Sequence, residues 1–338
     1  MAYSISEVES YAYIPGFNIR TDLALEAHEV ITKTEDIPGV NVEKEGDEDI
    51  MVHRISITTP EGSAKMGKAM GNYITLEVPG LRKKNTQLQD KVIRVFYKEL
   101  RKMFNLNERQ NVLVIGLGNW NVTPDALGPQ VVKELFITRH ILQMKPEILG
   151  EGYLSVCAVA PGVLGITGIE TGEIIRGIVN QIKPDLIVAI DALAAQRMER
   201  LHTTIQVADT GVVPGSGVGN HRLGINRQTM GVPVFAIGVP TVVDAITIAS
   251  DSMDKMAEAF RRESPQGNVF ASAVSKMDWN EKKGLIREVL QPFSGDLIVT
   301  PKEIDTLVED ISLVIAASLD AAFHPPFAEQ EEARANLS

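Results

Sequence analysis

The sequence predicts an α/β protein whose mostly parallel, twisted sheet carries helices on both faces. From about Asn111 onward, short runs rich in valine and isoleucine alternate with longer amphipathic stretches. Strands of this kind are buried on both faces, and their alternation with helices is typical of parallel sheets. The chain has 338 residues, 44% of them hydrophobic. That is enough to bury a sizeable core without disulfides or metal ions.

Five buried strands are expected in this part of the chain, at Val112–Ile115, Leu154–Ala160, Leu186–Ile190, Thr204–Ala208 and Val232–Ile237. Their apolar runs are short and continuous, as in strands that helices cover from both sides. Helical periodicity lies between them, at Leu127–Leu142, Ile169–Ile182 and Ala192–Leu201. Ahead of the first strand, apolar residues from Leu88 to Met103 recur at helical spacing. They predict an amphipathic helix that ends at the turn Asn105–Asn107.

The two ends of the chain follow other patterns. The segment Ile31–Thr75 predicts short strands and turns, within an N-terminal elaboration at about residues 31–80. Its charged run, Glu43–Asp49, lacks calcium-ligand spacing and is expected to be a solvated loop. Near the other end, Thr300–Glu303 predicts a capping box that opens a helix towards Ala322. Residues 324–338 begin with His-Pro-Pro, which stops that helix, and are expected to form a flexible tail.

Charge and composition restrict the partners and the compartment. The net charge is −11, which argues against a broad phosphate-binding surface, so we expect no direct contact with nucleic acid. No apolar run is long enough to span a membrane, and the N-terminus does not form a secretory signal. The single cysteine, Cys157, lies in a predicted strand and is expected to be a buried, inert thiol. These features predict a soluble protein of a reducing cytoplasm.

Several motifs for common chemistries are incomplete. The run Gly116–Asn121 follows a strand and precedes a helix, but Asn121 replaces the third glycine of a dinucleotide-binding loop. The run Gly215–Gly219 lacks the lysine of a phosphate-binding loop and the flanking glycines of a serine nucleophile elbow, so a surface loop is expected. Glu199 and His202, three residues apart on a predicted helix, are expected to form a surface ion pair. No cofactor is therefore expected.

Two aspartates remain at the ends of predicted strands, where open α/β sheets bind their ligands. Asp125 follows the first strand after the loop Asn119–Pro124, and Asp191 follows the third. Each alone also fits a structural role, Asp125 as a turn residue and Asp191 as a helix N-cap. Two neighbouring carboxyl groups share a proton, so the ionised one takes a proton from water while the neutral one polarises an amide carbonyl. Asn119 and Thr123 are expected to orient this pair.

The same residues resemble a known family. The run Val114–Pro129, which reads VIGLGNWNVTPDALGP, resembles the signature block of the bacterial spore germination proteases. Further matching blocks are Ala160–Thr171, Ala189–Ala195, Asp209–Gly211 with Pro214–Asn220, and Gly238–Ala245. The resemblance covers about Ile19 to Phe323, which is nearly the whole chain.

The resemblance implies an atypical aspartic endopeptidase that degrades small acid-soluble spore proteins when a spore germinates. The two critical aspartates of the family correspond to Asp125 and Asp191. The supporting residues of the same block are Gly116, Gly118, Asn119 and Thr123. A shorter part of the pattern is similar to hydrogenase maturation endopeptidases, which implies their phosphorylase-like α/β fold. Those enzymes place acidic residues around nickel, but Pro124-Asp125 replaces their acidic pair here, and no metal is expected.

The resemblance also implies a zymogen that removes its own N-terminus. Substrates of the family are cut after an acidic residue and before an apolar residue followed by alanine, and Arg20–Ala24 (RTDLA) has this form. We expect self-cleavage between Asp22 and Leu23, with residues 1–22 as the propeptide and residues 23–323 as a single protease domain. A chain that includes the propeptide is expected to be the inactive precursor. The family forms homotetramers and acts in the forespore and spore core, so the same is expected here.

Two alternatives stay open. A metal-dependent endopeptidase on the same fold would use Asp125 and Asp191 together with Asp209, Asp244 or His202 as ligands. A non-catalytic chaperone would bind spore proteins away from DNA without cutting them. The activation trigger is open too, although acidification suits a carboxyl pair that shares a proton.

Overall fold

The computed structural model describes residues 21–32, 36–106, 110–213, 223–263, 268–277, 279–290 and 297–335. Three of the regions discussed above lie outside this part. They are residues 1–20 of the expected propeptide, the glycine-rich run Gly215–Gly219, and the chain end after Ala335.

A mixed, nine-stranded sheet forms the centre of the described structure, in the order β1-β2-β3-β7-β8-β6-β4-β5, with β9 paired to β8. The strands are β1 (Val40–Gly46), β2 (Met51–Ile57), β3 (Gly71–Glu77), β4 (Asn111–Gly116), β5 (Ser155–Val159), β6 (Leu186–Ala195), β7 (Thr204–Ala208), β8 (Val234–Asp244) and β9 (Ile298–Val299). All five predicted strands are present. Cys157 lies in β5, where burial raises the pKa of its thiol.

The sheet is mixed, so the expectation of a mostly parallel sheet is wrong. Pairing is parallel between β5, β4, β6 and β8. It is antiparallel from β8 through β7 and β3 to β1, and between β8 and β9. β7 runs against β8 and so joins the N-terminal meander to the parallel strands. The likeness to the phosphorylase-like fold stays a prediction.

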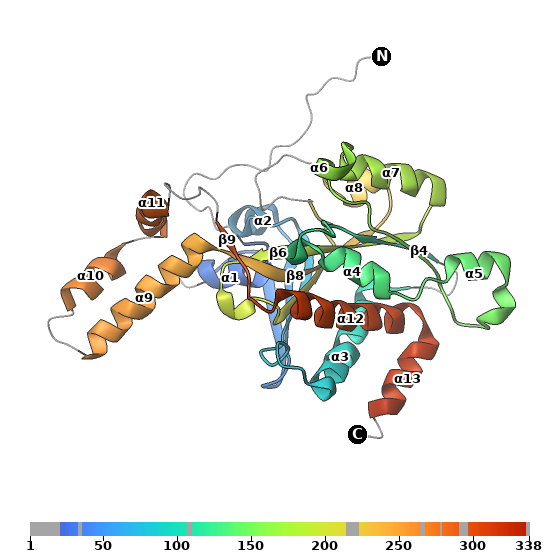
Figure 1. Ribbon diagram of the computed structural model, residues 1–338, viewed down its shortest axis with the longest axis horizontal. Helices are drawn as coiled ribbons and strands as arrows, with labels where there is room; N and C mark the ends of the chain where they lie inside the picture. The colour runs from blue at the N-terminus through green and yellow to red at the C-terminus, as the bar shows by residue number, and fades with distance from the viewer. Residues whose placement is uncertain are drawn as a thin grey trace, which may run out of the picture.

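Helices cover both faces of the sheet (Figure 1). The α-helices are α1 (Ala24–Ile31), α2 (Pro60–Met66), α3 (Thr86–Phe104), α4 (Leu127–Glu134), α5 (Arg139–Met144), α6 (Leu164–Thr167), α7 (Thr171–Ile182), α8 (Arg227–Met230), α9 (Ala245–Glu263), α10 (Asn268–Lys276), α11 (Trp279–Leu290), α12 (Ile304–Phe323) and α13 (Pro325–Ala335). The short 3₁₀ helices are η1 (Thr123–Asp125), η2 (Pro146–Ile148) and η3 (Met198–Arg200). In Figure 1, α3, α12 and α13 lie below the sheet and α6, α7 and α8 above it, while α9, α10 and α11 extend to one side.

The two faces of the sheet bury separate cores. Alternate residues of β6 point to opposite faces: Val188 and Ile190 join the core under α3, α4 and α12, and Ile187 and Ala189 join the core under α7 and α8. A third core packs α1 and α2 against β2 and β3. Because both faces of the sheet are buried, successive residues of a central strand are apolar, which explains the continuous apolar runs in the sequence.

The prediction of a helix over residues 192–201 is wrong, because β6 continues to Ala195 and is followed by η3. β8 is long enough to pair with the extra residues, up to Ala195 with Val243. The expected helix over 127–142 is divided into α4 and α5, because the backbone between them bonds elsewhere. In that gap the Asp320 carboxylate accepts from Phe136 N, and Thr138 N donates to the carbonyl of Val156.

Three expectations for the chain ends are also corrected. Glu43–Gly46 of the charged run belongs to exposed strand β1 rather than to a loop. The Thr300 hydroxyl donates to the carbonyl of Thr241, 2.9 Å away, so Thr300 does not cap α12, which begins at Ile304. Beyond His324 the chain forms α13 rather than a flexible tail, and Lys98 of α3 makes an ion pair of 2.8 Å with its Glu332. No helix in the described ranges is long and apolar enough to cross a membrane.

Asp320, buried in α12, gives the first testable prediction. Burial raises the pKa of its carboxyl from 3.8 to about 7. The folded chain therefore keeps a proton that the unfolded chain loses above about pH 4, and the free energy of unfolding falls as the pH rises through about 7. Asp320→Asn keeps the acceptor for Phe136 N and removes the titration. Relative to the unmodified chain, it should gain up to about 4 kcal/mol between about pH 4 and pH 8.

Urea unfolding across that pH range measures the difference. The control is Asp305→Asn, which changes an exposed aspartate of the same helix. This control should follow the unmodified chain at every pH. A constant difference between Asp320→Asn and the unmodified chain would contradict the prediction.

Candidate active site

A cavity of about 370 Å³ opens on the sheet face that α1, α2, α7 and α8 cover. β6, β7 and β8 form its floor, and the segments after α2 and β7 form its sides. Its polar lining includes Asp22, Lys68, Asp191, Gln206 and Asn226. Of the residues expected at the site, the cavity therefore contains Asp22 and Asp191.

Asp191 lies within β6 and is not a helix N-cap, so that structural reading is wrong. It pairs with Gly238 of β8, and Gly238 pairs with Gln206 of β7. Residues paired in this way present their side chains on the same face. Asp191 and Gln206 therefore share the cavity face, with their backbones about 10 Å apart. Gly238 lies between them without a side chain, and the Leu193 side chain fills the space that a Cβ there would need.

Asp125 is the last residue of η1, which folds back over the end of β4. Asn119 N donates to the main-chain carbonyl of Asp125 over 3.0 Å. At Gly118, where φ is +113°, a Cβ would lie 1.9 Å from that same carbonyl oxygen, so only glycine allows the approach. At Gly116, a Cβ would lie 2.3 Å from the carbonyl oxygen of Gly128. Thr123 begins η1, and its carbonyl accepts from Ala126 N.

Asp125 follows the carboxyl end of β4, and Asp191 lies within β6, the parallel strand next to β4. Gly116, the last residue of β4, pairs with Ile190, the residue before Asp191. η1 packs against β6, β8 and α12. Asp191 lines the cavity, whereas Asp125 is not among its lining residues. The catalytic roles of both residues stay predictions.

The segment expected to be cleaved borders the same cavity through Asp22. Asp22 pairs with the end of β6: its N–H donates to the carbonyl of Ala194 over 3.3 Å, and Ala194 N donates to its Oδ2 over 2.9 Å. Leu23 and Ala24 are both 0% exposed. Two hydrogen bonds to Ala194 therefore hold the residue before the expected scissile bond at the end of β6.

Two residues that sequence reasoning missed contact this segment. Lys68 Nζ donates to the carbonyl oxygens of Thr21 and Asp22, and Gln206 Nε2 donates to that of Asp22. Neither belongs to a recognisable motif. Lys68 follows α2 and Gln206 lies in β7, so only the tertiary structure brings them to Asp22.

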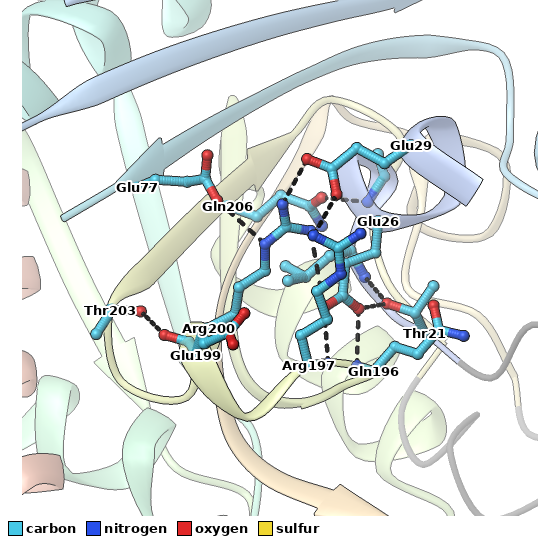
Figure 2. A network of polar contacts seen from close by, with 12 residues as sticks. Thr21, Glu26, Glu29, Glu77, Gln196, Arg197, Glu199, Arg200, Thr203 and Gln206 are labelled. Atoms are coloured by element: carbon cyan, nitrogen blue, oxygen red, sulfur yellow. Dashed lines mark hydrogen bonds and ion pairs between the residues drawn. The ribbon is translucent and has the colours of Figure 1, made fainter. Parts of the chain in front are cut away.

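A buried network of carboxylates fixes the chain just after Leu23 (Figure 2). Glu26, 1% exposed, accepts from Gln196 N and Arg197 N and from the Thr21 hydroxyl. Arg200 lies 3.7 Å from Glu26, 2.7 Å from Glu29 and 3.1 Å from Glu77. Burial raises the pKa of Glu26, which these donors and Arg200 oppose.

A metal-dependent enzyme on this fold would also use Asp209, Asp244 or His202 as ligands, and both of these aspartates accept hydrogen bonds from other groups. Asp209 accepts from Asn72, and Asp244 accepts from Ile246 N at the start of α9. His202 is buried, which lowers the pKa of its imidazole to about 4. Glu199 makes an ion pair with Lys255, so the expected Glu199–His202 pair is wrong. Within the described ranges, no group of three or more His, Cys, Asp or Glu side chains is arranged to hold a metal ion.

Comparison with known proteins gives a consistent result. The sequence profile of the family described as "Germination protease" matches residues 20–271 and 263–336. The germination protease of Caldanaerobacter subterraneus is 49% identical over 313 residues, covering 93% of this chain and 96% of that protein. Those of Clostridium perfringens and Bacillus cereus are 47% and 44% identical, each covering 91% of this chain. The matches cover 96% and 94% of those two proteins.

Arg200 gives the second prediction. Arg200→Met removes the cation shared by three carboxylates. Glu29 would keep Arg197 and Glu77 would keep its contact with His53, but buried Glu26 would lose its ion-pair partner. We expect the free energy of unfolding to fall by about 3–5 kcal/mol, because an unpaired buried charge is costly. Arg197→Met is the matched control: this side chain is 37% exposed and contacts only Glu29 among the ion pairs of the network, at 3.1 Å. It should change stability by less than about 1 kcal/mol. Equal losses in urea unfolding would contradict this account.

Gly238 gives the third prediction. A Cβ at this position would lie 2.4 Å from Cδ1 of Leu193, which also lines the cavity. Gly238→Ala should displace Leu193 and lower the free energy of unfolding by about 1–3 kcal/mol. Gly177→Ala, at an exposed position of α7 with open space at its Cβ, should instead leave stability unchanged or raise it by up to about 1 kcal/mol. Chemical denaturation measures both, and a neutral Gly238→Ala would refute the packing argument.

Proposed function

Because the chain belongs to the germination protease family, which consists of peptidases, we propose that it is a zymogen that cuts itself between Asp22 and Leu23. It then initiates the degradation of small acid-soluble spore proteins during germination. The observation that carries this proposal is that Asp22, the residue before the proposed scissile bond, lines the same cavity as Asp191. A substrate-like segment and a candidate catalytic carboxyl group therefore share one space.

The environment of this segment fits cleavage after an acidic residue and before Leu-Ala. The Asp22 carboxylate is held by Ala194 N, and the positive charge of Lys68 attracts it. Leu23 and Ala24 are fully buried, and Ala24 N donates to Gln206 Oε1 over 2.7 Å. A larger side chain in place of Ala24 would need space that the closed packing does not offer. These contacts support the cleavage rule that the family resemblance implies.

In the proposed mechanism, Asp125 and Asp191 share one proton. The ionised carboxylate takes a proton from water as the water oxygen bonds to the carbonyl carbon of Asp22. The protonated partner then gives its proton to the nitrogen of Leu23 as the C–N bond breaks. The products are a new carboxylic acid at Asp22 and an amine at Leu23, and the pair again holds one proton. The new acid then loses its proton to the amine, which gives a carboxylate and an ammonium group. General acid–base catalysis of this kind contributes about 10²–10⁴-fold.

The proposed setting follows from the same family membership. A net charge of −11 suits a basic or neutral partner, such as a protein that itself binds DNA. We propose that the protease acts in the forespore and spore core as a homotetramer. Metal-dependent cleavage on this fold and non-catalytic binding of spore proteins are the competing functions, and the following experiment separates all three.

The fourth prediction concerns self-cleavage. The purified full chain is shifted to mildly acidic pH with excess chelator, and its intact mass is followed over time. A new species that begins at Leu23 should appear. Asp125→Asn and Asp191→Asn should each slow its formation by about 10²–10⁴-fold, because each removes one partner of the acid–base pair. Asp36→Asn, which changes an exposed aspartate, is the control and should process normally.

Each other outcome favours a different function. Processing that occurs only without chelator would support a metal-dependent peptidase. Binding of a spore-protein peptide without new termini in either molecule would support a chaperone. Normal processing in either aspartate variant would overturn the proposed acid–base pair.

A further inference from the structure

Lys68 holds the carbonyl group of the bond that we propose is cleaved. Its Nζ lies 3.0 Å from the carbonyl oxygen of Asp22 and 2.9 Å from that of Thr21. The backbone that carries Lys68 is fixed to α2: Ser63 Oγ donates to the Lys68 carbonyl over 2.7 Å, and Lys68 N donates to the Ser63 carbonyl over 3.3 Å. The ammonium group is therefore placed in advance at the carbonyl that hydrolysis would attack.

Gln206 spans the same bond with its two amide atoms. Nε2 donates to the carbonyl oxygen of Asp22 over 3.3 Å, and Oε1 accepts from Ala24 N over 2.7 Å. The side chain is 7% exposed and lies in the middle of strand β7. A rigid, buried amide that binds on both sides of a peptide bond fixes that bond relative to the sheet.

We propose that Lys68 and Gln206 form the oxyanion-binding site of this protease. They donate to the carbonyl oxygen before the scissile bond and stabilise the negative charge that it acquires when water adds to the carbonyl carbon. This inference rests on the proposed function, because it takes Asp22–Leu23 as the cleaved bond. It assigns catalytic contacts to two residues outside the aspartate pair.

The assignment divides the chemistry between two sets of groups. As the water oxygen bonds to the carbonyl carbon, the electron pair of the C=O bond moves to the oxygen, where Lys68 and Gln206 bind it. The proton of the water goes to the ionised carboxylate of the pair. When the C–N bond breaks, the electron pair on oxygen re-forms the carbonyl and the protonated carboxyl gives its proton to the leaving nitrogen. The neutral carboxyl is then not needed to polarise the carbonyl.

The surroundings of Lys68 favour this role. Burial lowers the pKa of its ammonium group, while the negative charges of Asp22 and Glu26 raise it. Donors that are shielded from water and fixed before the reaction stabilise an oxyanion more strongly than water does. Asp191 and Gln206 line the same cavity, which offers a place for the attacking water.

The test follows self-cleavage of the full chain by intact mass, with Lys68→Met, Lys68→Arg and Gln206→Glu. Lys68→Met keeps the length of the side chain but removes its charge and donors, and should slow processing by about 10²–10³-fold. Lys68→Arg restores both and should recover to within about tenfold of the unmodified chain. Gln206→Glu keeps the acceptor for Ala24 N but places a carboxylate against the oxyanion, so it too should process slowly. Lys65→Met, which changes an exposed lysine on α2, should process normally.

The outcomes separate this inference from the proposed function. If the unmodified chain gives no species beginning at Leu23, the proposed cleavage fails. If it does, and Lys68→Met processes at the same rate, the oxyanion site is refuted while the protease stands. Melting temperatures identify a purely structural effect. If Lys68→Met and Lys68→Arg slow processing equally and both lower the melting temperature, the inference is overturned. A rate that falls with Met, recovers with Arg and leaves the melting temperatures unchanged supports it.

Discussion

The pairing of β6 with β8 beyond Ile190 is the constraint on which the candidate site depends. Because β6 continues to Ala195, Asp191 lies inside a strand with a fixed orientation rather than at the start of a helix. The same extension also positions the backbone of Ala194, which forms two hydrogen bonds with Asp22. A single continuous strand thus holds both a candidate catalytic carboxyl group and the segment beside it, and their relative position follows from strand geometry.

A network of buried charged side chains fixes the chain on the C-terminal side of the Asp22–Leu23 bond. Three glutamates and Arg200 join α1, β3 and η3, elements that are far apart in the sequence. Such networks specify one arrangement, because any displacement leaves a buried charge unpaired. The network begins only three residues after Leu23, so the chain on the C-terminal side of the proposed cleavage site is firmly held. Cleavage would separate the propeptide from a domain that keeps its own anchors.

Local sequence patterns predicted much of the fold, and the incorrect predictions have a common cause. All five central strands were predicted, because their apolar runs are buried on both faces. The segment 192–201 was predicted as a helix because its apolar spacing fits one, yet the long partner strand β8 outweighed that local preference. The mixed direction of the sheet was missed as well, since the direction of a strand such as β7 depends on its neighbours and leaves no mark in its own residues.

The sequence alone determined the family and the five central strands. It also placed Asp125 and Asp191 after neighbouring strands, although the structure extends the second of these strands through Asp191 to Ala195. These features rest on local periodicity and on contiguous motifs such as Gly116–Asp125, whose glycines are required by close backbone contacts. Only the tertiary structure placed Asp22 at the same cavity as Asp191 and brought Lys68 and Gln206 to the carbonyl of Asp22. Those contacts join residues separated by 46 to 184 positions. No local pattern encodes such contacts, because they arise from the pairing of distant strands.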